Sequence, residues 1–294
     1  MDLAAVIVNY RSRDPLLTCL RTVTADLAGL AAEIVVVDNS PGDGAAEAVA
    51  AGHPAVRWLP NRDNVGFARA VNQGIAATGA PVVLLLNPDC EVRPGAVRAL
   101  LARLGEDPRT GIAAPRIVNP DGSLEYSARS YPDHLTFLFN RYSLLTRLFP
   151  GNRWSRRYLL TDWNHDTPRA VDWVSGACMC VRRRAIDQVG PMDEAFFMFN
   201  EDVDWCRRMK ARGWAVSYVP AAVVVHHVGA SRKRVDPKVI VERHRGMIHY
   251  FHKHHPTNPV LRLVADAAIM TRAGLMLAGN AFKPRAGGET RRPR

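Results

Sequence analysis

The stretch PVVLLLNPDCE, residues 81–91, decides the fold, and the rest of the chain is organised around it. Its five consecutive apolar residues, 82–86, are typical of a strand buried on both faces. The run ends abruptly in Asn87, Pro88 and Asp89. Ligands of open α/β sheets bind beyond the carboxyl ends of the strands, so Asp89 is predicted at a ligand-binding edge. A carboxylate there can hold a divalent cation and, through it, phosphate oxygens, although Asn-Pro-Asp is also a common turn sequence.

Composition places the chain among ordinary globular proteins. Its 294 residues are 47% hydrophobic and 23% charged, which suits one large α/β domain or two smaller ones. The net charge of +11, with the basic excess in the second half, indicates an anionic partner: nucleic acid, a membrane surface or a phosphorylated substrate. The five cysteines are odd in number and scattered, and the first residues run straight into an apolar strand. A cytoplasmic protein with reduced thiols is therefore expected.

The first part of the chain has the pattern of a βαβ unit. Short apolar runs at 4–8 and 33–37 flank a segment, 15–30, whose apolar residues recur at helical spacing. The second run ends in Asp38. A second carboxylate therefore arrives at the same sheet edge as Asp89.

A third unit follows, with a strand predicted over 55–59 and a helix over 68–77. Between them, Gly66 would let the backbone approach a ligand closely, and free N–H groups at the helix start favour anions. Asn64 could equally be an N-cap residue. With polar residues at three strand ends, the chain up to Glu91 describes a nucleotide-binding half-domain. Because carboxylates repel phosphates, the acids of this half-domain indicate that a metal or a sugar hydroxyl lies between them and the phosphate.

The middle of the chain changes character. A helix is predicted over 94–104, a strand over 112–118 and a hairpin-type turn over 119–123. The segment 135–160 then mixes aromatic and aliphatic residues with arginines. Such a segment can lie in a membrane interface or cover an acceptor groove. It can equally be a core helix with a solvated arginine face.

A dense group of acids follows a predicted strand over 172–181 and a helix over 182–189. The apolar run 196–199 leads directly to Glu201 and Asp202 at a helix start. The helix dipole would stabilise Asp202 as an anion, and an apolar wall would give one of these acids the basicity of a general base. Acids are also common in first helical turns without any catalytic role.

Two further strands, 214–219 and 222–225, lead to His226. A histidine that leaves a strand near a carboxylate-bound cation can supply a nitrogen ligand, and the alternative is a surface pair with His227. Later histidines are predicted on a helix surface near phosphate or membrane: His249, His252, His254 and His255.

The end of the chain is predicted to contain an apolar-leaning helix over 258–280. Charges interrupt its apolar run short of the roughly 20 residues needed to span a bilayer, so the helix could instead lie on a membrane. Residues 283–294 are predicted to be a disordered basic tail.

Taken together, these sequences resemble the family 2 glycosyltransferases, in particular the bacterial rhamnosyltransferase-like branch. The resemblance covers residues 3–255. It rests on motifs in order: VIVNY at 6–10, VDNS at 37–40, NVGFA at 64–68 with Asn72, LNPD at 86–89, FMFNEDVD at 197–204, and His226 with Ser231.

The resemblance implies a GT-A fold, an α/β architecture with a Rossmann-like nucleotide-binding mixed sheet flanked by helices, and amphipathic helices at the C-terminus. It implies inverting transfer from a nucleotide-sugar donor with Mg²⁺ or Mn²⁺ on the diphosphate. Residues 1–232 would form the transferase domain, with a nucleotide-sugar half over 1–120 and an acceptor half over 121–232. Residues 233–282 would form a helical, membrane-associating segment.

The resemblance also implies roles for single residues. Asp89 stands where the family's Asp-x-Asp motif ends, and Asn87 replaces the first acid, which makes the metal requirement less strict. Asp202 would be the general base, with Glu201 as the fallback. His226 would complete the metal or diphosphate site. The remaining nucleotide-sugar residues would be Asn9, Asp38 at the base, and Asn64, Gly66 and Asn72 on the ribose or phosphate side.

Within the branch, the favoured donor is dTDP-β-L-rhamnose and the favoured acceptor is a polyprenyl-diphosphate-linked sugar such as GlcNAc. The protein would then attach peripherally to the anionic inner face of the plasma membrane. Galactosyl, glucosyl and mannosyl transferases share these motifs and remain alternatives. A nucleic-acid-binding module is disfavoured because acids at three strand ends would repel a phosphate backbone. A catalytically inactive relative is disfavoured because Asp89, Asp202 and His226 are all present.

Overall fold

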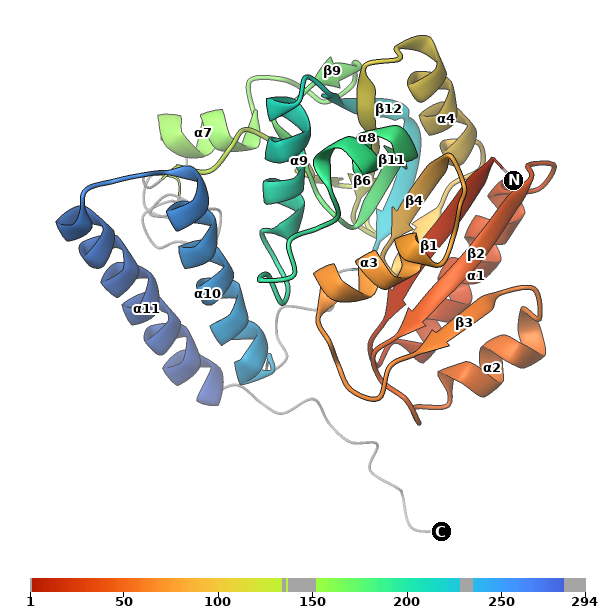
Figure 1. Ribbon diagram of the computed structural model, residues 1–294, viewed down its shortest axis with the longest axis horizontal. Helices are drawn as coiled ribbons and strands as arrows, with labels where there is room; N and C mark the ends of the chain where they lie inside the picture. The colour runs from red at the N-terminus through yellow and green to blue at the C-terminus, as the bar shows by residue number, and fades with distance from the viewer. Residues whose placement is uncertain (1, 134–135, 137–151, 228–234, 283–294) are drawn as a thin grey trace, which may run out of the picture.

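The computed structural model describes residues 2–133, 136, 152–227 and 235–282. One large mixed sheet carries helices on both faces, and a pair of long C-terminal helices stands beside it (Figure 1). Most of the segment predicted over 135–160, the basic tail and Ser231 lie outside the described residues.

The sheet is centred on the strand predicted from the apolar run, β4 (Val82–Leu86). Its order is β3-β2-β1-β4-β11-β6-β12-β5, and β1 pairs in parallel with both β2 and β4. The other strands of this path are β1 (Leu3–Asn9), β2 (Ala32–Asp38), β3 (Arg57–Pro60), β5 (Cys90–Val92), β6 (Thr110–Val118), β11 (Cys178–Arg182) and β12 (Ala215–His226). β7 (Leu124–Glu125) pairs with β6 and β9 (Arg169–Ala170) with β12, while β8 (Ala128–Arg129) and β10 (Trp173–Val174) form a separate two-stranded sheet.

Alternating side chains of the central strands fill two hydrophobic cores, one on each face of the sheet. On β4, Leu84 and Leu86 belong to one core and Val83 and Leu85 to the other, so this strand is buried on both faces as predicted. The first core contains α1 (Arg13–Asp26), α2 (Ala45–Gly52) and α4 (Ala96–Glu106). The second contains α3 (Phe67–Ala76), α8 (Arg183–Val189) and α9 (Glu201–Ala211).

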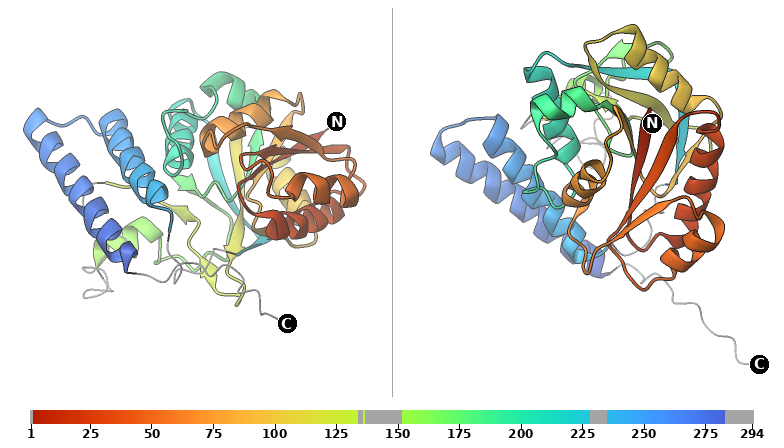
Figure 2. Two further views of the ribbon diagram at one scale, coloured as in Figure 1. Left: turned by 90° about the horizontal axis from the view of Figure 1, so that it is seen from below. Right: turned by 45° about the vertical axis from the view of Figure 1, so that its right-hand side comes forward.

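The remaining helices lie on the side of the second core. They are α7 (Arg153–Leu159), α10 (Pro237–His254) and α11 (Pro259–Ala281). α10 and α11 run side by side as a hairpin, and both views of Figure 2 show this pair projecting beyond the sheet. Tyr250 and Phe251 of α10 and Ile269 of α11 join the second core. Among the described helices, none has both the length and the hydropathy needed to cross a bilayer.

Two of the strand predictions were wrong. The strand predicted over 172–181 is broken at residues 175–177, and its two parts, β10 and β11, belong to different sheets. The break allows the Gly176 N–H to donate to Asp202 instead of to a neighbouring strand. Conversely, the strands predicted over 214–219 and 222–225 are the single strand β12, whose register against β6 shifts between Val219 and Val223. Pro220, which cannot donate a ladder hydrogen bond, lies within that shift.

Gly74 allows α3 to pack closely against β1. A Cβ at Gly74 would lie 2.3 Å from Val6 Cγ1 in the core. We expect Gly74→Ala to lower the free energy of unfolding by about 1–3 kcal/mol because the core must be overpacked or shifted. Gly105→Ala in α4, where no atom lies within 4 Å of the new Cβ, is the control and should leave stability unchanged or slightly raised. Urea denaturation of both variants measures this difference, and equal losses would contradict the packing argument.

Candidate active site

The carboxyl ends of β1 and β2 carry Asn9 and Asp38 side by side, as the βαβ prediction required. Both side chains are buried. The Asn9 amide donates to Asp38 Oδ1 over 2.9 Å, and the same oxygen accepts from the Ser40 N–H and hydroxyl at 3.0 and 3.1 Å. The Asp38 carboxylate is therefore held in one orientation at the sheet edge.

The loop before α3 is fixed by contacts within the protein. Asn64 Oδ1 accepts from the Gly66 N–H at 3.0 Å and from the Asn39 amide at 3.2 Å. Gly66 has φ of +90°, and a Cβ there would lie 2.5 Å from the Phe197 carbonyl oxygen. The absence of a side chain at Gly66 therefore allows a close approach to the Phe197 backbone.

Asn72 also contacts protein backbone. Its amide donates to the Met192 carbonyl oxygen at 2.9 Å, and its oxygen accepts from the Met192 N–H at 3.0 Å. These bonds fasten α3 to the turn that precedes the acidic motif. Asn72 does not line the central cavity described below.

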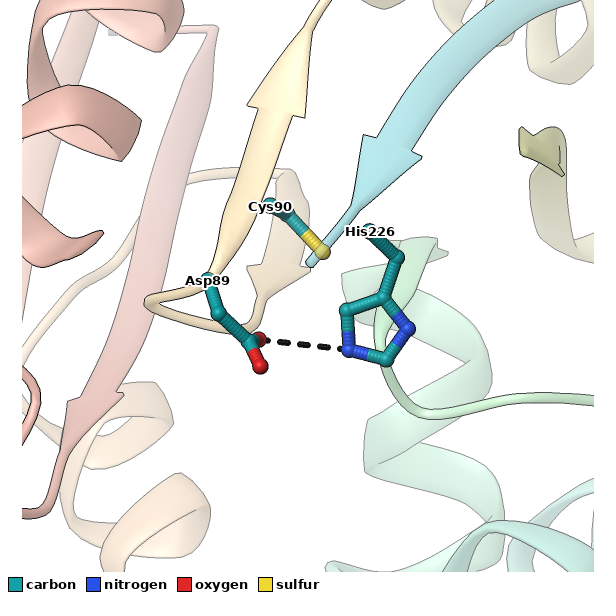
Figure 3. A group of neighbouring side chains, drawn as sticks. All are labelled: Asp89, Cys90 and His226. Atoms are coloured by element: carbon teal, nitrogen blue, oxygen red, sulfur yellow. Dashed lines mark ion pairs between the residues drawn. The ribbon is translucent and has the colours of Figure 1, made fainter. Parts of the chain in front are cut away.

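Asp89 and His226, which are far apart in sequence, meet at the sheet edge. Figure 3 shows the Asp89 carboxylate facing the His226 ring, with Oδ1 and Nε2 3.2 Å apart. The other ring nitrogen, Nδ1, lies 2.9 Å from Glu125 Oε2 on β7. Burial alone would lower the pKa of His226, but the hydrogen bonds with Asp89 and Glu125 outweigh it and raise the pKa to about 9.

These residues fit a hard divalent cation. Asp89, Cys90 and His226 each offer a ligand atom within 4.8 Å of the others. Burial raises the pKa of the Cys90 thiol well above its ordinary value, so the sulfur is a poor donor. With a pKa of about 9, His226 holds a proton that it would release on binding a cation through Nε2, which leaves one carboxylate and one imidazole as the useful donors. Glu125 holds the imidazole with Nε2 towards Asp89, the outer-shell arrangement common for metal-binding histidines. A carboxylate, an imidazole and ligand oxygens suit Mg²⁺ or Mn²⁺.

A central cavity of about 410 Å³ is lined by both His226 and the acids at the start of α9. His226 and Asn87 lie at its sheet side, and Glu201 and Asp202 line it at the start of α9. The rest of its wall is aromatic, apolar and arginine-rich, including Phe67, Arg129, Tyr158, Leu159, Trp173, Gly176, Arg243, Met247, Tyr250 and Arg272.

Glu201 and Asp202 have different environments although they are neighbours. Asp202 accepts from the Gly176 N–H at 3.0 Å and from its own helix at the Val203 N–H, 2.8 Å away. Burial raises the pKa of Asp202 above its ordinary value, while these bonds and the Arg129 charge oppose the rise. Glu201 is 5% exposed, and its Oε2 has no hydrogen-bond partner among the described residues. Burial and the Asp202 charge raise the pKa of Glu201 well above its ordinary value. Asp202 is therefore the acid of the two that ionises more readily.

The backbone before these acids is held in an uncommon conformation. Phe199 and Asn200 have positive φ angles of 68° and 71°. The conformation is unusual for phenylalanine, and α10 packs against it where a Cβ on Gly246 would lie 3.0 Å from the Phe199 carbonyl oxygen. The turn aims the first residues of α9 into the central cavity.

Asp204, the third acid, anchors α9 to α10. It is fully buried and lies 2.6 Å from His254, 2.9 Å from Lys253 and 2.7 Å from Arg208. Burial alone would raise the pKa of Asp204, but hydrogen bonds from His254 and Lys253 lower it.

The predicted histidine cluster at α10 also pairs with protein groups, and its predicted place beside phosphate or membrane stays a prediction. His249 pairs with Asp193 at 3.0 Å and His252 with Asp266 at 2.9 Å, while His255 lies 3.0 Å from Arg207.

Several residues of the site carry no local sequence signal. Glu125 follows the predicted hairpin turn, but only the β6–β7 register brings it to His226. Arg129 lies on β8, which no predicted strand or helix covers, and the Gly176 N–H lies at the break in the strand predicted over 172–181. Arg243 and Arg272 enter from α10 and α11, and only the packing of that hairpin brings them to the cavity.

Comparison with known proteins gives consistent matches. The profile of Glycosyl transferase family 2 matches residues 4–189. The N-acetylglucosaminyl-diphospho-decaprenol L-rhamnosyltransferase of Mycobacterium tuberculosis is 36% identical over 229 residues, 74% of this chain and 73% of the relative. The low-salt glycan biosynthesis hexosyltransferase Agl10 of Haloferax volcanii is 26% identical over 239 residues, 80% of this chain and 70% of the relative. The structure of the mannosyltransferase PcManGT from Pyrobaculum calidifontis, solved with GDP-Man and Mn²⁺, matches with a TM-score of 0.58 at 16% sequence identity. The match covers 95% of this chain and 79% of the PcManGT chain.

Proposed function

The chain belongs to glycosyltransferase family 2 and has the GT-A fold, and from that premise we propose that it transfers L-rhamnose from dTDP-β-L-rhamnose to a polyprenyl-diphosphate-linked GlcNAc with inversion. The observation that carries the proposal is the central cavity, whose wall includes both Asp202 and His226, the partner of Asp89. The choice of sugar and acceptor is supported by the 36% identity to a rhamnosyltransferase whose name states both the sugar and the lipid-linked acceptor.

On the donor side, we assign Asp89 and His226 to hold Mg²⁺ or Mn²⁺ on the diphosphate. A bound divalent cation would neutralise the negative charge that develops on the leaving nucleoside diphosphate. Asn9 and Asp38, fixed together at the ends of β1 and β2, would contact the nucleotide, and Asn87 would face the sugar or diphosphate from the cavity wall. The 64–72 segment would support this region through its backbone contacts.

On the acceptor side, we assign Asp202 as the general base. Inversion needs one carboxylate that removes the proton of the acceptor hydroxyl as its oxygen attacks the anomeric carbon from the face opposite the leaving group. Asp202 lines the cavity, and its raised pKa makes it a better proton acceptor than an exposed carboxylate. Glu201, with an unsatisfied buried oxygen, is assigned as a neutral neighbour.

The assignment of the base predicts a pH dependence. Asp202 must be deprotonated to act, and its pKa is raised, so kcat should fall as the pH is lowered, with a midpoint above the ordinary aspartate value of about 3.9. Measuring kcat at saturating donor and acceptor across the acid range tests this. Glu201→Gln should keep the same midpoint, because the Glu201 carboxyl is already neutral there. A rate that stays constant down to about pH 4 would contradict the assignment.

We further propose that the protein attaches peripherally to the inner face of the plasma membrane through α11 and its basic charge. Leu263 and Leu275 of α11 are 71% and 70% exposed. Large apolar side chains of soluble proteins are seldom exposed to this extent. Together with the net charge of +11, this apolar surface suits an anionic lipid interface.

Vesicle sedimentation tests the attachment. The protein should bind vesicles that contain anionic phospholipid more strongly than neutral vesicles, and a fraction should stay bound at about 1 M salt, where the Debye length is only ~3 Å. Leu263→Gln should reduce that salt-resistant fraction. Complete release of the unaltered protein by salt would assign the attachment to charge alone and overturn the role of α11.

A donor panel tests the proposed function itself. Purified protein is incubated with Mg²⁺ or Mn²⁺ and a series of nucleotide sugars, and release of nucleoside diphosphate is measured with and without a polyprenyl-diphosphate-GlcNAc. Acceptor-dependent release from dTDP-rhamnose alone is the expected result. Release from a UDP- or GDP-sugar instead would keep the fold and the base but overturn the rhamnosyl assignment.

A further inference from the structure

A second cavity lies between α10 and α11. It has a volume of about 330 Å³, within the roughly 300–1,000 Å³ range of small-molecule sites. We call it the hairpin groove, and its wall consists of Val235, Val239, Ile240, Arg243, Met276, Gly279 and Asn280. Apart from one arginine and one asparagine, this wall is apolar.

The far end of the hairpin groove is fixed by paired hydrogen bonds. The buried Asn280 amide donates to the Val235 carbonyl oxygen at 2.7 Å, and its oxygen accepts from the Val235 N–H at 2.9 Å. These bonds tie the last turn of α11 to the segment before α10. They also satisfy the Asn280 side chain, so what the groove offers an occupant there is apolar surface.

Arg243 joins the hairpin groove to the central cavity, because it lines both. Its guanidinium lies over the Phe199 ring, 4.0 Å from the centroid, beside the turn that leads into Glu201. The hairpin groove and the cavity of the candidate catalytic acids therefore meet at the positively charged Arg243.

Arg272 of α11 adds a second cation on the central-cavity side. Burial, and then the charge of Arg243, lower the pKa of Arg272. Arginine forks match phosphate oxygens well, and two arginines that line the same cavity can together hold one diphosphate. The arrangement of two arginines next to an apolar groove is complementary to an anionic head with a hydrocarbon tail.

We propose that Arg243 and Arg272 bind the diphosphate of the lipid-linked acceptor and that the hairpin groove holds the isoprenoid units next to that diphosphate. The proposal rests on the proposed function for the identity of the acceptor. It also gives the reaction its geometry: the sugar on the diphosphate extends into the central cavity towards Asp202, and the lipid leaves between α10 and α11 beside the exposed apolar surface of α11.

Binding of farnesyl diphosphate, a short isoprenoid diphosphate, tests the subsite without requiring catalysis. The full chain is titrated without divalent cation, so that the donor site retains little diphosphate, and inorganic pyrophosphate and farnesol are titrated in parallel. Farnesyl diphosphate should bind more tightly than either, because only it uses both the arginine pair and the groove. Equal affinity of pyrophosphate and farnesyl diphosphate would overturn the role of the groove.

Two glycines of α11 give a matched pair of variants. Gly279 lines the hairpin groove and Gly274 does not, and neither has an atom within 4 Å of a new Cβ. Gly279→Trp should fill the groove and weaken farnesyl diphosphate binding about tenfold or more, while Gly274→Trp should leave it unchanged. Arg243→Ala should weaken farnesyl diphosphate and pyrophosphate together. Equal binding by the two tryptophan variants, with both folded by circular dichroism, would contradict the subsite.

The outcome is separable from that of the proposed function. If the donor panel is silent but farnesyl diphosphate binding responds to Gly279→Trp and Arg243→Ala, the subsite stands and the transfer reaction fails. If rhamnosyl transfer is found but binding ignores these variants, the reaction stands and the subsite fails.

Discussion

Asp202→Asn is expected to lower kcat for sugar transfer by about 100- to 10,000-fold, the usual contribution of a general base. Asparagine keeps the shape of the side chain and its oxygen can accept from either the Gly176 or the Val203 N–H, but it loses the other bond and cannot take the acceptor proton. Nucleotide-sugar affinity should stay close to that of the unaltered protein, because the nucleotide and the cation are assigned to other residues than Asp202. Steady-state kinetics and donor titration measure the two effects separately.

Glu201→Gln is the matched control for this result. Glutamine is an isostere of the protonated acid that burial favours at Glu201, so most of the activity should remain. A Glu201 variant as inactive as Asp202→Asn would mean that the two acids act as a unit. Activity retained in Asp202→Asn and lost in Glu201→Gln would move the base to Glu201.

His226→Ala is expected to have the second large effect. It removes the imidazole that faces Asp89 and leaves Glu125 without its partner. We expect Mn²⁺ affinity to fall by more than the roughly 10- to 100-fold that loss of an outer-shell partner costs, and donor affinity in the presence of metal to fall with it. Titration with Mn²⁺, followed by donor binding with and without metal, measures both.

Glu125→Gln distinguishes the contribution of the Nδ1 side of the His226 ring, which faces Glu125, from that of the Nε2 side, which faces Asp89. The glutamine oxygen can still accept from Nδ1, so the ring keeps its orientation and loses only the neighbouring charge. Its Mn²⁺ affinity should lie between those of the unaltered protein and His226→Ala. Unchanged Mn²⁺ affinity in His226→Ala would remove His226 from the metal site.

Much of the fold could be predicted because its signals are local. The apolar run of β4 and the acid that follows it were enough to predict a core strand with Asp89 at the functional edge of the sheet. The structure places His226 in contact with Asp89, because Asp89 directly precedes β5 and Cys90 of β5 pairs with His226 at the end of β12. The predicted turn over 119–123 does connect two antiparallel strands, β6 and β7.

What could not be predicted depends on contacts between distant segments. The close packing of Gly66 against the Phe197 backbone, more than a hundred residues away in sequence, has no local sequence signal. Residues 172–181 have the composition of one strand. The strand is broken where the Gly176 N–H donates to the Asp202 carboxylate instead of to a neighbouring strand. Arg243 and Arg272 look like ordinary helix-surface arginines until α10 and α11 pack against the sheet.

The most direct test of the central claim is structural analysis of the product formed from dTDP-β-L-rhamnose and polyprenyl-diphosphate-GlcNAc. Mass spectrometry and the NMR signature of the anomeric carbon should show one rhamnose added in α linkage, because a single attack assisted by Asp202 inverts the β configuration of the donor. A β-linked product would require a covalent intermediate and a second carboxylate, and would contradict the account.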